Sequence, residues 1–172
     1  MGGRILVAYA TKYGATKGIA EAIGEGLRSA GREVDVLPAE KVGDVNAYAA
    51  VVLGSAVYAG MWQKSAISLL EHCEQELAGR PVWLFSSGPT GDGDPVKLMN
   101  GWTFPEAQKA AADRIGARDR VLFHGVLDEG KLGLPEKLLL KAMKAPMGDF
   151  RDWDSIRAWA RSIAEALDKE KR

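Results

Sequence analysis

The sequence has few of the residues that bind metals or form disulfides. Its 172 residues include one cysteine, Cys73, and two histidines. A single thiol cannot form an internal disulfide or a cysteine-based metal cluster, so we expect no metal site. A chain of this length buries about 70% of its unfolded surface and folds without such supports. The single cysteine therefore indicates a reducing compartment, and we expect the protein to be cytoplasmic.

The sequence also lacks an excess of charge of either sign and any long apolar run. Lysine and arginine number 23, and aspartate and glutamate also number 23. The strong positive field that nucleic-acid binding requires is therefore absent, and we expect no nucleic-acid partner. Apolar stretches such as residues 47–59 are far shorter than the run of about 20 residues that spans a bilayer. The sequence thus predicts no transmembrane segment.

What the sequence does contain is an alternation of short β-rich runs and amphipathic helical stretches. The expected strands cover residues 4–10, 33–37, 50–54, 82–86 and 121–127. The expected helices cover residues 16–30, 63–77 and 105–115, with a last helix whose apolar stripe runs from Trp153 to Leu167. This pattern is typical of an α/β fold with a parallel sheet covered on both faces. We find no repeat or linker, so residues 1–172 are expected to form one three-layer, doubly wound domain with a five-stranded sheet.

The loop after the first expected strand has the composition of a phosphate-binding loop. In a doubly wound sheet, ligands bind beyond the carboxyl ends of the strands. A helix N-terminus offers unpaired N–H groups there, the Thr11 and Thr16 hydroxyls can add contacts to a phosphate, and Gly14 permits close approach. The alternative is that Thr16 only caps the helix and Gly14 only makes the turn. The candidate cofactor-binding residues of this first loop are Thr11, Lys12, Tyr13, Gly14, Ala15 and Thr16.

The loop after the third expected strand carries two large aromatic residues among small ones. It reads G-S-A-V-Y-A-G-M-W over residues 54–62. An aromatic ring at the carboxyl end of a strand can stack on a planar ligand, whereas the alternative is that it packs on neighbouring helices. The candidate cofactor-binding residues of this second loop are Ser55, Ala56, Val57, Tyr58, Ala59, Gly60 and Trp62.

The loop after the fourth expected strand is rich in glycine and hydroxyl residues. Its backbone N–H groups could meet the acceptor edge of a pyrimidine-like ring, or the segment could be only a turn. The candidate residues of this third loop are Ser86, Ser87, Gly88, Thr90 and Gly91.

The three loops together resemble the flavodoxin family over essentially the whole chain. The first loop, T-K-Y-G-A-T, is similar to the family's phosphate loop, with Tyr13 at a usual threonine position. The resemblance implies sheet order 2-1-3-4-5 and FMN as the cofactor, with Tyr58 and Trp62 stacking on the ring. It also implies that the third loop contacts the pyrimidine end of the ring and that the Ala59-Gly60 peptide can reorient toward the flavin N5. No catalytic side chain is assigned, because the flavin carries the redox chemistry.

A looser resemblance extends to the flavodoxin-domain branch that includes the menaquinone-dependent protoporphyrinogen oxidases. It rests on the second loop, on the basic stretch of residues 137–144 and on residues 148–153, which read G-D-F-R-D-W. This resemblance implies an FMN-dependent oxidoreductase that dehydrogenates protoporphyrinogen IX and passes electrons to a quinone. The alternatives are a diffusible electron carrier with a redox partner protein and a non-catalytic flavin-binding module.

Two segments are expected to distinguish these functions. Residues 90–104 form the expected wall of a substrate pocket, with Trp102 and Phe104 as apolar contacts. Residues 137–144 are interpreted as a solvated charged face over a small satellite core, with contact to anionic lipid or to a redox partner as the alternative. Small carrier flavodoxins are typically strongly acidic, so the zero formal charge favours the oxidoreductase.

Overall fold

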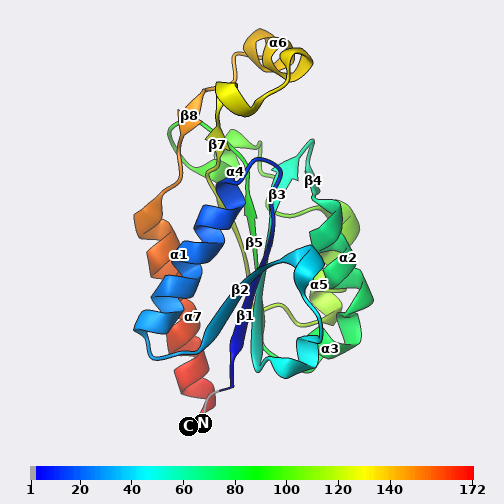
Figure 1. The fold of residues 1–172 in the computed structure, drawn as a ribbon, viewed down its shortest axis with the longest axis vertical. Coiled ribbons are helices and arrows are strands. Elements are labelled where there is room, and N and C mark those ends of the chain that lie inside the picture. Colours follow the sequence, from blue (N-terminus) through cyan, green and yellow to red (C-terminus); the bar gives the residue numbers. More distant parts are fainter. Residues whose placement is uncertain (1–2) are drawn as a thin grey trace.

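A computed structural model describes residues 3–172 and places a parallel sheet between two layers of helices (Figure 1). The five parallel strands lie in the order β2-β1-β3-β5-β6, which confirms the predicted doubly wound, flavodoxin-like fold. The numbering shifts because a short strand, β4, pairs antiparallel with β3 and lies off this path. The strands are β1 Ile5–Ala10, β2 Val34–Pro38, β3 Ala50–Tyr58, β4 Met61–Trp62, β5 Val82–Ser87, β6 Asp119–Phe123, β7 Val126–Leu127 and β8 Gly148–Asp149.

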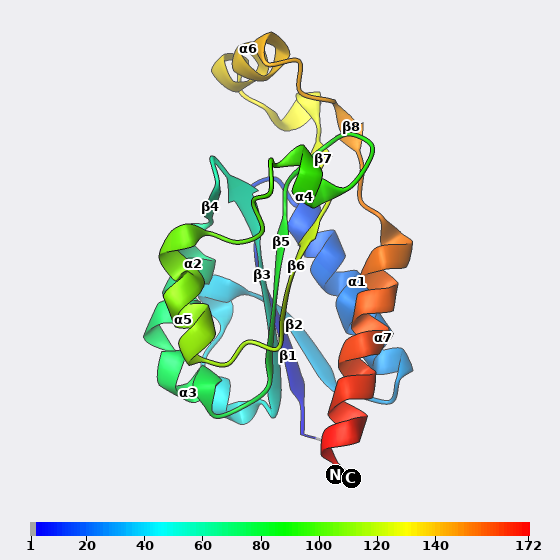
Figure 2. The ribbon, with the colours of Figure 1, turned by 180° about the vertical axis from the view of Figure 1, so that it is seen from behind.

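The helices divide between the two faces of the sheet. Helices α1 and α7 cover one face, and α2, α3 and α5 cover the other (Figure 2). The α-helices are α1 Ala15–Ser29, α2 Lys64–His72, α3 Glu74–Ala78, α4 Pro95–Leu98, α5 Lys109–Arg114, α6 Leu134–Ala142 and α7 Trp153–Glu170. The 3-10 turns are η1 Ala39–Lys41, η2 Val45–Ala47, η3 Glu106–Gln108 and η4 Glu129–Lys131.

Apolar residues at helical spacing form the core on each face of the sheet. Ile19 and Ile23 of α1 pack in one buried cluster with Ile163 of α7. Leu70 of α2 belongs to a second cluster on the opposite face, with Leu53 of β3. The central strand β1 is buried along its whole length, because helices cover both of its faces. These two cores hold the carboxyl ends of the strands in place.

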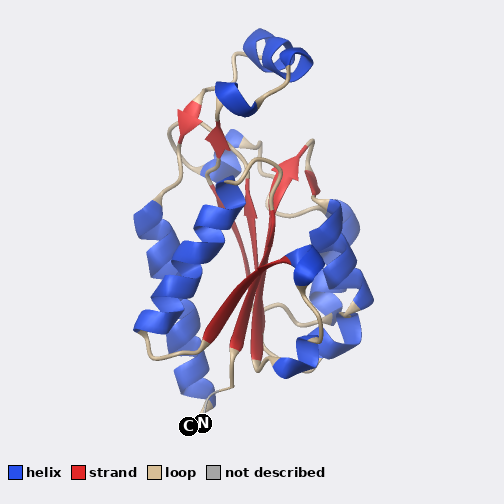
Figure 3. Cartoon of the chain, viewed as in Figure 1, coloured by secondary structure: helices blue, strands red, loops and turns tan. Residues whose placement is uncertain are grey.

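Several element boundaries differ from the predicted ones. The expected helix over residues 63–77 is broken at Cys73, which ends α2 and begins α3. The expected strand over residues 121–127 is divided, because the Gly125 N–H donates to the Pro89 carbonyl instead of continuing the sheet. Residues 126–127 form β7, which pairs with β8 in a separate ribbon (Figure 3). The expected loop of residues 54–62 is a hairpin, since β3 continues to Tyr58.

The segment between β7 and α7 projects beyond the carboxyl end of the sheet. This insertion, residues 128–151, contains η4, α6 and β8 (Figures 1 and 2). No helix within residues 3–172 is long and apolar enough to cross a membrane.

Candidate functional site

The first loop opens a helix whose N-terminus is free of side-chain caps. Gly14 is the N-cap of α1 and has φ +95°, a left-handed conformation that favours glycine. Its N–H donates to the Thr11 hydroxyl oxygen at 2.8 Å. The first turn of α1 has no acidic side chain, and no side chain caps it. This helix end is therefore suited to an anion.

Thr16 joins the first loop to the third loop. Its side chain is fully buried, and its hydroxyl lies 2.9 Å from that of Ser87 in a hydrogen bond. The interpretation of Thr16 as the helix cap is wrong, because Gly14 occupies the N-cap position. The bond fixes the start of α1 against the end of β5.

The second loop is a tight hairpin. Ala59 and Gly60 form its turn with φ values of +51° and +75°, the left-handed conformations that two-residue hairpin turns use. The turn follows Tyr58, whose side chain is 41% exposed at the carboxyl end of the sheet. A large exposed ring at this edge is available to a planar ligand.

Trp62 is buried and is not in the ring-stacking position that the flavodoxin resemblance implies. It is 3% exposed, and its indole N–H donates to the Ser86 hydroxyl at 2.8 Å. Its ring meets Phe104 edge to face, with centroids 5.1 Å apart. Ser55 and Ser86 are also buried, and Ser55 accepts a hydrogen bond from the Gln63 N–H. These three buried residues therefore stabilise the hairpin from the interior of the protein. The cavity at the carboxyl end of the sheet is not lined by Trp62, Ser55 or Ser86.

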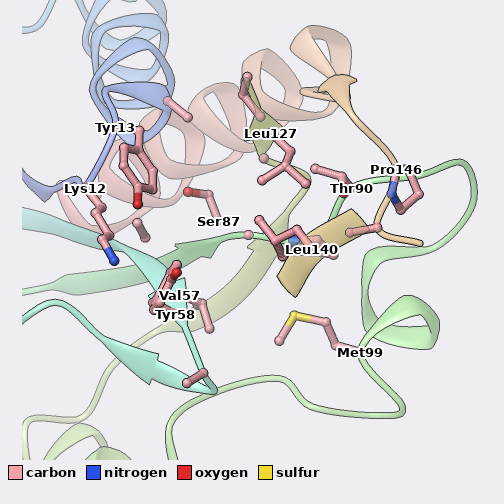
Figure 4. A pocket seen from close by; sticks show the side chains of 18 of the residues that line it. Lys12, Tyr13, Val57, Tyr58, Ser87, Thr90, Met99, Leu127, Leu140 and Pro146 are labelled. Carbon is pink, nitrogen blue, oxygen red and sulfur yellow. The ribbon is translucent and has the colours of Figure 1, made fainter. Parts of the chain in front are cut away.

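A cavity of about 680 Å³ lies where the three loops meet (Figure 4). Such a volume is typical of sites for drug-sized ligands and cofactors. Gly14 and Gly91 flank this cavity but are not among its lining residues. The predicted residues that line it are Thr11, Lys12, Tyr13, Ala15, Thr16, Ala56, Val57, Tyr58, Ala59, Gly60, Ser87, Gly88 and Thr90.

The far side of the cavity is apolar and comes partly from the expected wall of residues 90–104 and partly from residues that the sequence did not single out. Figure 4 shows Met99 and Leu140 across from Tyr13 and Lys12. Thr90, Leu98 and Met99 of the expected wall line the cavity. Its two expected apolar contacts, Trp102 and Phe104, do not, and Phe104 is buried against Trp62. The apolar lining residues outside that wall are Val126, Leu127, Leu132, Leu139, Leu140, Met143, Ala145 and Pro146.

The insertion is attached to the first loop by polar contacts. The Tyr13 hydroxyl donates to the Glu136 carboxylate, and the Lys12 ammonium lies 3.5 Å from the same carboxylate. The Lys131 ammonium donates to the Tyr13 carbonyl at 3.0 Å. From the sequence, residues 137–144 of this segment are expected to form a charged face. The apolar spacing L-x-x-x-L-L-L-x-x-M over residues 134–143 is the signal that the segment contacts a cavity.

The contacts between the insertion and the first loop place charged side chains beside the cavity. The Lys12 ammonium lies 3.5 Å from the centroid of the Tyr58 ring, a cation–π contact. The hydrogen bond from Tyr13 lowers the pKa of Glu136, and the same bond raises the pKa of Tyr13. Glu136 is therefore a carboxylate at neutral pH, and Lys12 and Lys131 place positive charge beside the first loop. Within residues 3–172, no group of three or more histidine, cysteine, aspartate or glutamate side chains could hold a metal ion.

Comparisons with solved structures agree with the fold. Oxidised flavodoxin 2 from Bacillus cereus is 22% identical, with a TM-score of 0.60, and the match covers 95% of this chain and 99% of that one. A flavodoxin from Streptococcus pneumoniae is 16% identical, with a TM-score of 0.59 and coverage of 97% and 99%. The rubredoxin oxygen:oxidoreductase of Desulfovibrio gigas is 13% identical, with a TM-score of 0.60. The match covers 96% of this chain but only 36% of that larger protein.

No curated protein matches the chain in sequence. A family model described as "Flavodoxin domain" matches residues 6–154, which include all three loops and the insertion. The chain therefore belongs to the flavodoxin-domain family.

Proposed function

We propose that residues 1–172 form one FMN-binding domain whose first loop holds the phosphate. Flavodoxin domains bind FMN. The uncapped N-terminus of α1 and the absence of acidic residues in its first turn fit a phosphate group. The Lys131 ammonium adds a positive charge at the same loop. Because the loop surrounds a terminal phosphate, we expect FMN to bind more tightly than FAD.

The flavin ring in this proposal is held by the second and third loops. Tyr58 supplies a ring that is 41% exposed and has the Lys12 ammonium over one face. Ser87, Gly88 and Thr90 also lie on the cavity wall. The Ala59-Gly60 turn is at the same edge and has backbone groups that can face the ring. Trp62 has no stacking role here, because it is buried against Phe104.

The function supported best is that of an FMN-dependent oxidoreductase that acts on an apolar organic substrate. The observation that carries this proposal is the apolar half of the cavity, where Met99 of the third-loop segment faces Leu140 of the insertion. An electron carrier needs only an exposed ring edge, and the insertion covers this side with leucine and methionine. Dehydrogenation of protoporphyrinogen IX with a quinone as acceptor is the specific reaction that we propose.

The residues of the chain have separable roles in this reaction. FMN, when bound, supplies one- and two-electron redox chemistry through its ring. Met99 and Leu140 exclude water and hold the apolar substrate, while Lys12 presents a cation to an anionic group. In each turnover the substrate loses two electrons and two protons, and one quinone gains them to become its quinol.

A second candidate function is a diffusible carrier that exchanges electrons with a redox partner protein. The observation that favours it is the sheet topology itself, which the chain shares with flavodoxins along their whole length. In either case we propose a cytoplasmic protein without a nucleic-acid partner. A non-catalytic flavin-binding module remains the third alternative.

The test is anaerobic mixing of the FMN-loaded chain with protoporphyrinogen IX, and of the reduced chain with a menaquinone analogue, in detergent. We expect the flavin absorbance to bleach in the first mixture and to return in the second. Met99→Ser should slow both steps, because Met99 lines the cavity. Met61→Ser is the matched control, since Met61 is 62% exposed and lies outside the cavity lining.

The outcomes separate the candidates. Rapid reduction by a flavodoxin reductase, with no response to either compound, would establish the carrier. A chain that takes up no FMN would contradict all three functions.

A further inference from the structure

Helix α6 carries large apolar side chains that are exposed. Leu134, Leu138, Leu139 and Met143 are 60–70% exposed, and α6 contains no buried residue. The interpretation of this segment as a charged face over a satellite core is therefore incomplete, because its leucines point outward as well. Exposed contiguous apolar surface of this kind marks an interaction site.

The other strongly exposed apolar side chains lie at the same end of the molecule. Within residues 3–172 these are Tyr58, Met61 and Leu98. They belong to the β3–β4 hairpin and to α4, which follow the carboxyl ends of β3 and β5. Figures 1 and 2 show these elements at the end of the sheet from which α6 projects. The exposed apolar side chains therefore lie at the end of the molecule where the cavity opens.

Basic residues accompany this apolar face. Lys137, Lys141 and Lys144 lie along α6 and the turn that follows it. Lys141 forms an ion pair with Glu129 at 2.7 Å, and the one glutamate within α6 is Glu136. That carboxylate is turned to the first loop, where it accepts the Tyr13 hydrogen bond. The surface that α6 presents outward is therefore apolar with a basic border, which complements an anionic lipid surface.

We propose that α6 docks this protein on an anionic lipid bilayer. With 9 residues, the helix is about 14 Å long, too short to cross a bilayer, so it lies in the headgroup region. A helix of this length offers too little surface for a second copy of the chain to be the occupant, because a stable dimer buries about 800 Å² on each partner. A helix that projects beyond its domain also suits a flat surface better than a groove.

Docking through α6 would place the cavity mouth at the lipid surface. Leu139 and Leu140 of α6, and Met143 just after it, line the cavity. Leu134 and Leu138 of the same helix are exposed and lie outside the cavity lining. An apolar substrate dissolved in the bilayer, such as a quinone, would then reach the cavity without crossing water. This delivery route rests on the proposed function, whereas the docking surface does not.

The experiment is co-sedimentation of the full FMN-loaded chain with vesicles of phosphatidylcholine, alone or with about one-third phosphatidylglycerol. We expect binding to the anionic vesicles that weakens as salt rises from about 0.1 M to about 0.5 M. Leu134→Ser with Leu138→Ser should lower the partition coefficient by about ten-fold, and Lys137→Glu with Lys141→Glu by about five-fold or more. The matched control is Lys169→Glu, an exposed lysine near the far end of α7.

Three results would overturn the proposal. The first is a wild-type chain that stays in the supernatant with anionic vesicles, and the second is leucine variants that bind them as the wild type does. The third is a concentration-dependent dimer that the leucine variants abolish, which would make a second copy the occupant. Vesicle binding is measured without turnover, so failure of the substrate assay in detergent leaves this test intact. An unchanged flavin spectrum in each variant verifies its fold.

Discussion

The hydroxyl of Tyr13 donates a hydrogen bond to the carboxylate of Glu136, which is 123 positions further along the chain. Tyr13 belongs to the first loop and Glu136 to α6, so this bond attaches the insertion to the proposed phosphate site. The Lys12 ammonium lies 3.5 Å from the same carboxylate. Glu136 therefore makes two of the polar contacts that join the insertion to the first loop, and Lys131 makes another through the Tyr13 carbonyl.

The first prediction concerns the titration of Glu136. The Tyr13 hydrogen bond lowers its pKa, so the carboxyl group should titrate below the usual value of about 4.3. In Tyr13→Phe the pKa should return toward that value, as measured by NMR of the side-chain carboxyl carbon. Glu129, whose pKa is lowered by the hydrogen bond from Lys141, is the internal control and should not change.

The sign of the pH dependence follows from the direction of this shift. A carboxyl group with a lowered pKa in the folded protein stabilises it above the unfolded value of about 4.3. The stabilisation is lost as the pH falls through the folded value. We therefore expect the insertion to detach from the first loop in acid, seen as lower amide protection factors in α6 of the wild type but little change of these factors with pH in Glu136→Gln. Equal pH response in both proteins would contradict this role.

The second prediction concerns Lys131 and the phosphate. The Lys131 ammonium donates to the Tyr13 carbonyl at 3.0 Å, and it would lie 3.8 Å from a Cβ on Gly14. Lys131→Met should weaken FMN binding about 10- to 150-fold, the scale of a charge-assisted hydrogen bond, in a fluorescence-quenching titration. Riboflavin, which has no phosphate, should bind both proteins equally. Lys137→Met is the matched control on the same insertion, and an equal loss for riboflavin would refute the phosphate contact.

The third prediction concerns the Thr16–Ser87 bond. Both side chains are buried, so Thr16→Val leaves the Ser87 hydroxyl without its partner. The apoprotein should lose about 1–3 kcal/mol of unfolding free energy in urea. Thr103→Val, at an exposed position, should change it by less than about 0.5 kcal/mol. Similar values for the two variants would show that the bond adds no stability.

The fold could be predicted from the sequence because local patterns determine it. The apolar run of β1 and the helical spacing of Ile19 and Ile23 each indicate one element and one buried face. The residues at which strands and helices end were less predictable. The end of β6 depends on the Gly125 N–H, which donates to the Pro89 carbonyl far away in the chain.

The candidate site could be predicted from the sequence only where its residues are neighbours within one loop. Residues 11–16 lie together at a helix start, so their convergence follows from the fold. Glu136 and Lys131 reach the same place through tertiary contacts that no short pattern encodes. The roles of Tyr58 and Trp62 could not be separated in the same way. Both are large aromatic residues among small ones in one loop, so the sequence does not tell which ring faces the ligand. Hairpin pairing of Val57 with Trp62 places one ring inside and leaves the other exposed.

The last prediction separates Tyr58 from Trp62 by two measurements on each variant. Tyr58 is 41% exposed on the cavity wall, so Tyr58→Ala should weaken FMN by about 1–3 kcal/mol and change the unfolding free energy of the apoprotein by less than about 1 kcal/mol. Trp62→Phe keeps a ring against Phe104 but leaves the Ser86 hydroxyl without its indole partner. It should destabilise the apoprotein by about 1–3 kcal/mol and leave FMN affinity of the folded protein unchanged. If Tyr58→Ala bound FMN as the wild type does while Trp62→Phe bound it weakly, the stacking role would belong to Trp62 and the hairpin would have to rearrange on binding.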